Sequence, residues 1–120
     1  MRALAVVLLL LAGGAARAET QPPCRTLADC DALIRQNPTL AAYERRAFLH
    51  LTQRRGLEDV HKAIADFSAA IALEPSRALS MYGRGMARLM SGDSAGQNEM
   101  EAAIMLQRDV AEEFKRYGAQ

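Results

Sequence analysis

The side chains that could carry out catalysis are few in this chain. Its two histidines, His50 and His61, are eleven positions apart and fall on different predicted helices. Asp59 is near His61, but residues two positions apart on a helix do not face each other. A zinc site needs three or four suitably spaced ligands, and two histidines with scattered carboxylates do not supply them. We therefore expect no metal site and no catalytic histidine.

The serines, the paired acids and the glycines have structural explanations. Ser76 is expected to cap a helix, and neither it nor Ser80 has a base at a suitable spacing. Glu112 and Glu113 are adjacent on a predicted helix, so their side chains diverge. The glycines within residues 83–85 lie inside a predicted helix rather than in a phosphate-binding loop. The chain is therefore predicted not to be an enzyme and to need no cofactor.

The first eighteen residues differ in composition from the rest. Arg2 is followed by an apolar run over residues 3–12, and Ala16-Arg17-Ala18 offers a small-x-small cleavage site. This layout is typical of a secretory signal peptide, with an uncleaved amphipathic segment as the weaker alternative. The apolar run is shorter than the roughly twenty residues of a membrane-spanning helix. We assign residues 1–18 to a signal peptide and expect a periplasmic or secreted protein that does not insert into the membrane after cleavage.

The mature chain is short and almost neutral. Cleavage after Ala18 would leave 102 of the 120 residues, which is enough for one small domain. Arg2 and Arg17 would be lost from the fifteen basic residues, leaving thirteen against fourteen acidic ones and a net charge of about −1. Without a basic excess, a nucleic-acid partner is not expected.

Cys24 and Cys30 are the two cysteines of the chain. In an exported protein they are expected to pair, because that compartment is oxidising. The alternative is a redox-active pair, but the spacing is not C-x-x-C. Closing a loop of seven residues, both cysteines included, would stabilise the fold by about 2 to 2.5 kcal/mol on the chain-entropy model. We predict a structural disulfide.

Apolar residues at three- and four-residue steps predict helices along the mature chain. The clearest stripe contains Ile64, Phe67 and Ile71, and Pro75 ends its helix. No stretch has the alternating pattern of a strand, so the fold class is predicted to be all-α. Residues 19–38 would form a leader and a disulfide-tied N-terminal helix, and residues 39–120 a helical repeat domain. The expected helices cover about residues 26–37, 39–54, 57–74, 76–90, 94–106 and 109–117, with N-caps at Thr26, Thr39 and Ser76.

Two of these helical hairpins repeat each other. A shift of 33 residues aligns residues 66–73 with residues 99–106 and leaves four of the eight positions identical. A shift of 38 residues aligns Arg46-Ala47 and Leu51 with Arg84-Gly85 and Leu89. A helical hairpin repeated at this interval is typical of an α-solenoid.

The repeated residues match a known consensus. The segments are Tyr82-x-Arg-Gly-x-Ala, Gly92-Asp93 and Ala63-Ile-Ala-Asp-Phe-x-x-Ala-Ile-x-Leu-x-Pro75. Residues 40–111 thereby resemble about two units of the tetratricopeptide repeat (TPR) family, and the chain is similar to short exported bacterial proteins with such repeats. The resemblance implies close helix packing at small residues, namely Ala47, Ala63, Ala70 and Gly85. In the second unit Gly96 or Gln97 replaces the first alanine, and Arg108 replaces the closing proline.

The resemblance implies a function in protein–protein interaction. TPR proteins bind peptides or protein segments in a groove lined by the first helix of each hairpin. Carried over by position, the partner-binding residues here would be Glu44, Arg45, Phe48, Leu79, Tyr82 and Met86. Apolar side chains would bury those of the partner, while Glu44 and Arg45, expected to be mostly solvated with Arg46, would form the polar edge.

Two repeats are few for a stable solenoid, which normally needs about three. The disulfide-tied helix and the last helix could serve as N-terminal and C-terminal caps, or the chain could form a homodimer. A scaffold of the bacterial cell envelope that binds a protein or peptide is the first hypothesis. The alternative is an obligate accessory or self-associating subunit whose apolar face is permanently buried.

Overall fold

The computed structural model describes residues 21–118 and shows only helices there, without a strand. The all-α prediction is therefore confirmed for this part of the chain. The signal peptide predicted for residues 1–18 lies outside the described residues. The helices are α2 (Leu27–Gln36), α3 (Leu40–Thr52), α4 (Leu57–Leu73), α5 (Ala78–Met90), α6 (Ala95–Leu106) and α7 (Val110–Gly118).

Two of the three predicted N-caps are confirmed. The hydroxyls of Thr26 and Thr39 accept hydrogen bonds from the backbone N–H groups of Asp29 and Ala42, at 3.1 and 3.2 Å. The prediction for Ser76 is wrong, because Arg77 occupies the N-cap position of α5 and no side chain caps that helix. The Arg77 guanidinium bonds the Glu44 carboxylate on α3, and the N-cap of α5 lies one residue later than predicted.

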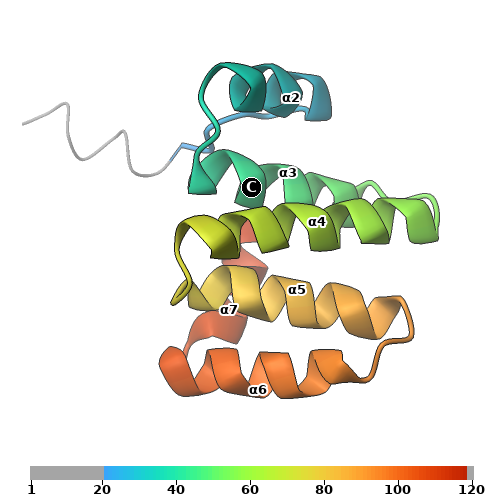
Figure 1. The fold of residues 1–120 in the computed structure, drawn as a ribbon, viewed down its shortest axis with the longest axis vertical. Helices are drawn as coiled ribbons and strands as arrows, with labels where there is room; N and C mark the ends of the chain where they lie inside the picture. The colour runs from blue at the N-terminus through green and yellow to red at the C-terminus, as the bar shows by residue number, and fades with distance from the viewer. Residues whose placement is uncertain (1–20, 119–120) are drawn as a thin grey trace, which may run out of the picture.

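Helices α3 to α6 form one layer in which each helix packs on the next in sequence (Figure 1). Helix α2 packs on α3 at the N-terminal end of this layer. Helix α7 lies on one face of the layer, behind α5 in Figure 1, and packs mainly against α5. The six helices thus form two consecutive hairpins, α3–α4 and α5–α6, with one further helix at each end.

The main core lies between the hairpins and α7. Phe67 is fully buried, and its ring meets Phe48 edge-on with the centroids 5.6 Å apart. The other buried members of this core are Ala47, Leu51, Val60, Ala63, Ala78, Leu79, Tyr82, Ala87, Ala103 and Val110. A second, smaller cluster joins Cys24, Cys30 and Leu49. It attaches the N-terminal segment to the side of α3.

Small residues set the close approach of neighbouring helices. A Cβ on Gly83 would collide with the ring of Phe67, so α4 and α5 approach closely there. A Cβ on Gly85 would lie 2.7 Å from the Gly96 carbonyl oxygen, and one on Gly96 would collide with the Gly85 carbonyl oxygen. Gly96 is therefore the small residue that lets α6 contact α5, and Gln97 beside it is exposed.

Candidate interaction groove

The face formed by α3 and α5 is partly covered by α7. The ring of Phe48 on α3 contacts both aromatic residues of α7, with centroids 4.6 Å from Phe114 and 4.4 Å from Tyr117. On α5, the ring of Tyr82 lies 5.3 Å from that of Phe114. Burial raises the pKa of Tyr117 to about 12, with a further contribution from the nearby Glu44 carboxylate. An amphipathic helix therefore already lies on the surface predicted to bind a partner.

Three of the predicted partner-binding residues are part of the core. Phe48, Leu79 and Tyr82 have exposed fractions of 2%, 1% and 9%. The sequence identified their helical stripe but gave no sign that α7 would cover it, since α7 was expected only to cap the end of the stack. The aromatic rings of α7 cover Phe48 and Tyr82, and Leu79 is buried in the same core.

The expectation that Glu44 and Arg45 are solvated is wrong. Glu44 is 1% exposed, and its carboxylate accepts hydrogen bonds from Arg77 Nε at 2.8 Å, Arg77 Nη2 at 3.1 Å and Ser80 Oγ at 2.5 Å. Arg45 is 4% exposed, and its Nε donates to the Cys24 carbonyl oxygen at 3.2 Å. Both charges are buried because partners distant in sequence satisfy them.

These two residues therefore join elements and do not form a polar edge. The hydrogen bond to Glu44 raises the pKa of Arg77, because it favours the charged guanidinium. Glu44 thereby ties α3 to the start of α5, and Arg45 ties α3 to the disulfide loop.

Two of the predicted site residues, Phe48 and Met86, line an open groove, and Met86 is the less buried of them. Met86 is partly buried, and the groove of about 390 Å³ lies at the side of α7. The lining is mostly apolar and comprises Phe48, Leu51, Thr52, Arg54, Met86, Met90, Phe114, Lys115 and Gly118. We call this hollow the α3–α5 groove. Sequence reasoning missed Leu51, Arg54, Phe114 and Lys115 as lining residues, although Leu51 belongs to the apolar stripe of α3.

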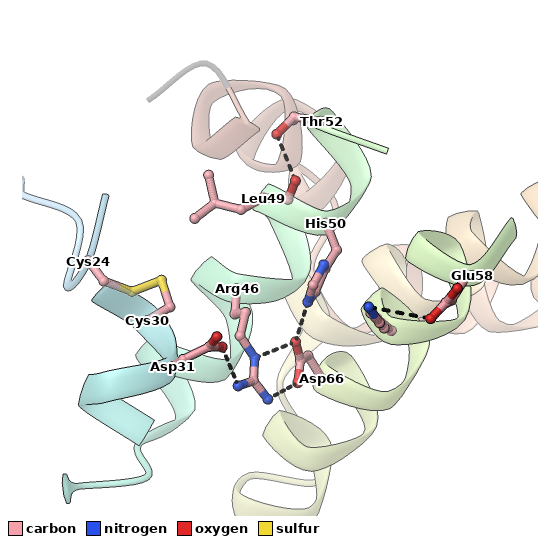
Figure 2. A network of polar contacts seen from close by, with 10 residues as sticks. Cys24, Cys30, Asp31, Arg46, Leu49, His50, Thr52, Glu58 and Asp66 are labelled. Carbon is pink, nitrogen blue, oxygen red and sulfur yellow. Dashed lines mark hydrogen bonds and ion pairs between the residues drawn. A yellow bond between two sulfur atoms is a disulfide. The ribbon is translucent and has the colours of Figure 1, made fainter. Parts of the chain in front are cut away.

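A polar network on the opposite side of α3 was not predicted (Figure 2). Arg46 donates to both carboxylate oxygens of Asp66, from Nε at 2.9 Å and from Nη2 at 2.8 Å. Its Nη1 donates to Asp31 Oδ1 at 2.9 Å. The hydrogen bond with Asp66 raises the pKa of Arg46, so this side chain links α2, α3 and α4 as a permanent cation. Arg46 too was expected to be solvated, and it is partly buried instead.

His50 extends this network toward the end of α3. Its Nε2 lies 3.7 Å from Asp66 Oδ2, and its buried Nδ1 has no hydrogen-bond partner. Burial lowers the pKa of His50, and the nearby cations Arg46 and Lys62 act in the same direction, while Asp66 opposes them. A neutral imidazole beside a carboxylate that already pairs with arginine is a poor catalytic base, because that arginine neutralises the charge that would activate it.

The second hairpin has a matching ion pair. Arg84 donates to the Glu99 carboxylate from Nε at 2.9 Å and from Nη2 at 2.5 Å, and Arg88 Nη1 reaches the same carboxylate at 3.1 Å. Arg46 and Arg84 occupy aligned positions on α3 and α5, and Asp66 and Glu99 occupy aligned positions on α4 and α6. In both hairpins an arginine of the first helix therefore bonds an acid of the second.

The predicted disulfide is confirmed. Cys24 and Cys30 are joined, with an S–S distance of 2.05 Å and Cα atoms 5.2 Å apart. Both residues are buried against Leu49, so the bond closes the loop that leads into α2 and presses it on α3 (Figure 2). A disulfide is compatible with the oxidising compartment expected for an exported protein.

The described part of the chain has neither a metal-ligand cluster nor a helix suited to span a membrane. Within residues 21–118 no three histidine, cysteine, aspartate or glutamate side chains lie close enough together to hold a metal ion. Across the same residues, no helix combines the length and apolar character needed to cross a membrane.

Comparison with known proteins yields no match. No family model matches the chain, and neither a curated protein nor a solved structure is significantly similar to it. The TPR resemblance and the solenoid architecture that it implies therefore stay predictions, drawn from the repeated residues.

Proposed function

We propose that this chain is a protein-interaction module of the bacterial cell envelope, built from two TPR-like hairpins, that binds a peptide or protein segment in the α3–α5 groove. The observation that carries the proposal is the apolar groove beside α7, which Met86, Met90 and Leu51 line. The proposal includes no catalytic step. It also retains the predicted signal peptide and a periplasmic or secreted location.

The packing of α7 supports this proposal, because α7 is an amphipathic helix that already lies on the face formed by α3 and α5. Its two aromatic side chains lie three residues apart and contact Phe48 together. This is the spacing by which an amphipathic helix inserts anchors into an apolar groove. A partner segment would extend the same contact surface along α3 and α5, where methionine side chains adapt to differing shapes.

The predicted site residues then divide into two groups by role. Met86 would contact the partner directly, because it borders the groove. Phe48, Leu79 and Tyr82 would form the base beneath the groove and hold α7. Glu44 would keep α3 and α5 in register through its bond to Arg77, and Arg45 would hold α3 on the disulfide loop through its bond to Cys24.

The proposal is tested by selecting binders from a displayed library of random twelve-residue peptides on the oxidised mature protein. Met86→Glu places a charge in the groove, and Met105→Glu is its control, because Met105 is 86% exposed and does not line the groove. Selected peptides should bind the wild type and the control, and lose at least tenfold in affinity on Met86→Glu. Recovery of no peptide, or equal binding to both variants, would reject the groove as a binding site.

A second candidate function is that of a self-associating or obligate subunit. It is favoured by three exposed apolar residues at the carboxyl ends of α4 and α6, at the same end of the layer (Figure 1). Leu73, Met105 and Leu106 are 55%, 86% and 57% exposed. Light scattering over a wide concentration range separates the candidates. A reversible binder with a free groove is expected to be monomeric, whereas a dimer that Met105→Glu dissociates would favour self-association.

A further inference from the structure

We propose that the ligand of the α3–α5 groove is an acidic peptide segment, with apolar side chains for the floor and carboxylates for a basic rim formed by Arg54, Arg55 and Lys115. This inference rests on the proposed function and adds the chemistry of the partner. Two observations support it: the sign of the charged side chains around the groove, and the contacts that each of these side chains already makes.

The groove continues beyond α7 around the α3–α4 turn. A second hollow of about 440 Å³ is lined by Arg54, Arg55, Gly56, Leu57, Val60 and Met90. It shares Arg54 and Met90 with the α3–α5 groove. The two hollows therefore form one surface, with Leu51, Val60, Met86 and Met90 along its length and room for several consecutive residues of a ligand.

All the charged side chains that line this surface are basic. Arg54, Arg55 and Lys115 belong to its lining, and no aspartate or glutamate does. The mature chain as a whole would carry a charge of only about −1, so the positive rim reflects the placement of charges and not a general basic excess. A rim of one sign around an apolar floor favours a ligand of the opposite sign.

The three basic side chains retain donors for a ligand. Arg54 Nη1 donates to the Leu51 carbonyl oxygen at 2.7 Å, and a guanidinium has four further N–H groups. The side chain of Lys115 is 75% exposed, and its contact of 3.7 Å with Glu112 is an exposed ion pair that leaves the ammonium open to a ligand. Arg55 is exposed and uses its backbone N–H to bond Asp59.

Besides Glu112, two acids close to this rim in the sequence have contacts of their own. Asp59 Oδ2 accepts the backbone N–H of Arg55 at 2.8 Å. Glu58 lies 3.6 Å from Lys62, one turn along α4. Carboxylates from a ligand would therefore meet basic groups that the chain itself does not fully neutralise. The apolar floor would supply most of the affinity, and the rim would supply selectivity and faster association.

The test uses the peptides recovered from the random library described above. If the inference holds, the recovered sequences contain more aspartate and glutamate than the input library, and their affinity falls when salt is raised. A labelled peptide from this set should bind Arg54→Glu/Arg55→Glu at least tenfold more weakly than the wild type. Lys115→Glu, an exposed change on another helix, should weaken binding independently.

The matched control is Arg35→Glu/Arg108→Glu, which makes the same change in net charge at exposed positions away from the groove. It should alter the affinity by less than twofold, and far-UV circular dichroism checks that each variant is folded. Recovered peptides without an acidic excess, or equal loss in the control, would overturn the inference while leaving the groove as a binding site. Recovery of no peptide would reject the proposed function itself.

Discussion

Among single residues, Asp66 on α4 is the buried acid that holds Arg46, the side chain that links α2, α3 and α4. It accepts both hydrogen bonds of a bidentate pair from Arg46, which in turn reaches Asp31 on α2, and it lies beside His50. Its side chain is only 7% exposed, so water cannot replace these contacts. Loss of the carboxylate therefore affects the packing of α2 and α4 on α3 together.

Asp66→Asn should lower the free energy of unfolding by about 1.5 to 3 kcal/mol, the range for hydrogen bonds to charged groups. Urea denaturation followed by circular dichroism measures the loss. The control is Glu58→Gln, which removes an exposed pair with Lys62 and should cost less than about 0.5 kcal/mol. Equal effects of the two changes would mean that the Arg46 network adds nothing beyond a surface ion pair.

His50 should make the protein less stable in mild acid. Its pKa in the folded protein is below the ordinary value of 6.5, mainly because it is buried. The unfolded chain therefore takes up a proton first, and stability falls as the pH decreases through 6.5 toward the folded-state pKa. Arg46 and Lys62 oppose protonation, whereas Asp66 and Asp59 favour it less strongly than burial disfavours it.

The measurement is the free energy of unfolding at several pH values between about 7.5 and 5.5, where His50 dominates the expected change. His50→Gln should flatten this dependence, because it removes the group whose pKa is lowered on folding. An unchanged slope in His50→Gln would show that the imidazole titrates alike in the folded and unfolded chain.

Between elements, the contact of α5 with α6 depends on two glycines that face each other. Gly96→Ala places a methyl group against the Gly85 carbonyl oxygen, so the helices must separate. Overpacking of this kind costs about 1 to 3 kcal/mol. In Gly118→Ala the new Cβ would lie 3.7 Å from Phe48, an ordinary contact, and the change should be nearly neutral. The melting temperatures of the two variants are compared by thermal unfolding. Similar values would contradict the close approach of α5 and α6 at Gly85 and Gly96.

The position of α7 on the α3–α5 face can be tested through Tyr117. Its ring is stacked on Phe48, and burial raises its pKa to about 12. A spectrophotometric titration should contain a late phenolate component that Tyr117→Phe removes. Tyr43→Phe, a change on the far end of α3, should retain it. Circular dichroism at each pH confirms that the helices persist during the titration. Absence of the late component would indicate that α7 does not cover Phe48.

Across the whole chain, the disulfide and two arginines attach the N-terminal segment to the repeat hairpins. Cys24 and Cys30 are buried against Leu49, while Arg45 bonds the Cys24 carbonyl oxygen and Arg46 bonds Asp31. The segment at residues 24–36 therefore packs on α3 through apolar, polar and covalent contacts together.

Cys24→Ser/Cys30→Ser should lower the free energy of unfolding by about 2 to 2.5 kcal/mol, because the open chain regains loop entropy when it unfolds. The transition in urea should shift to lower concentration and stay single, since polar and apolar contacts still hold α2 on α3. The matched comparison is the free energy of unfolding of the wild type with its disulfide oxidised and reduced. Two separate transitions in the double variant would show instead that α2 unfolds on its own.

Local patterns were sufficient to predict most elements of the fold. The three- and four-residue spacing of apolar side chains, Pro75, Gly92 and the hydroxyls of Thr26 and Thr39 act within a few residues, so they can be recognised without tertiary information. The helix bounds in the structure agree with the predicted bounds to within two residues. The Cys24–Cys30 pair is equally local, because only six positions separate its members.

Tertiary packing decided which of these residues face solvent. Glu44 was predicted at a polar edge because its charge favours water, but Arg77 and Ser80, more than thirty positions later, allow it to be buried. Phe48 was predicted to face a partner, but it faces α7. The sequence by itself determined the helices, the disulfide and the small residues between helices. Only the tertiary structure decided that α7 covers one part of the α3–α5 face, because that choice depends on contacts between residues far apart in the chain.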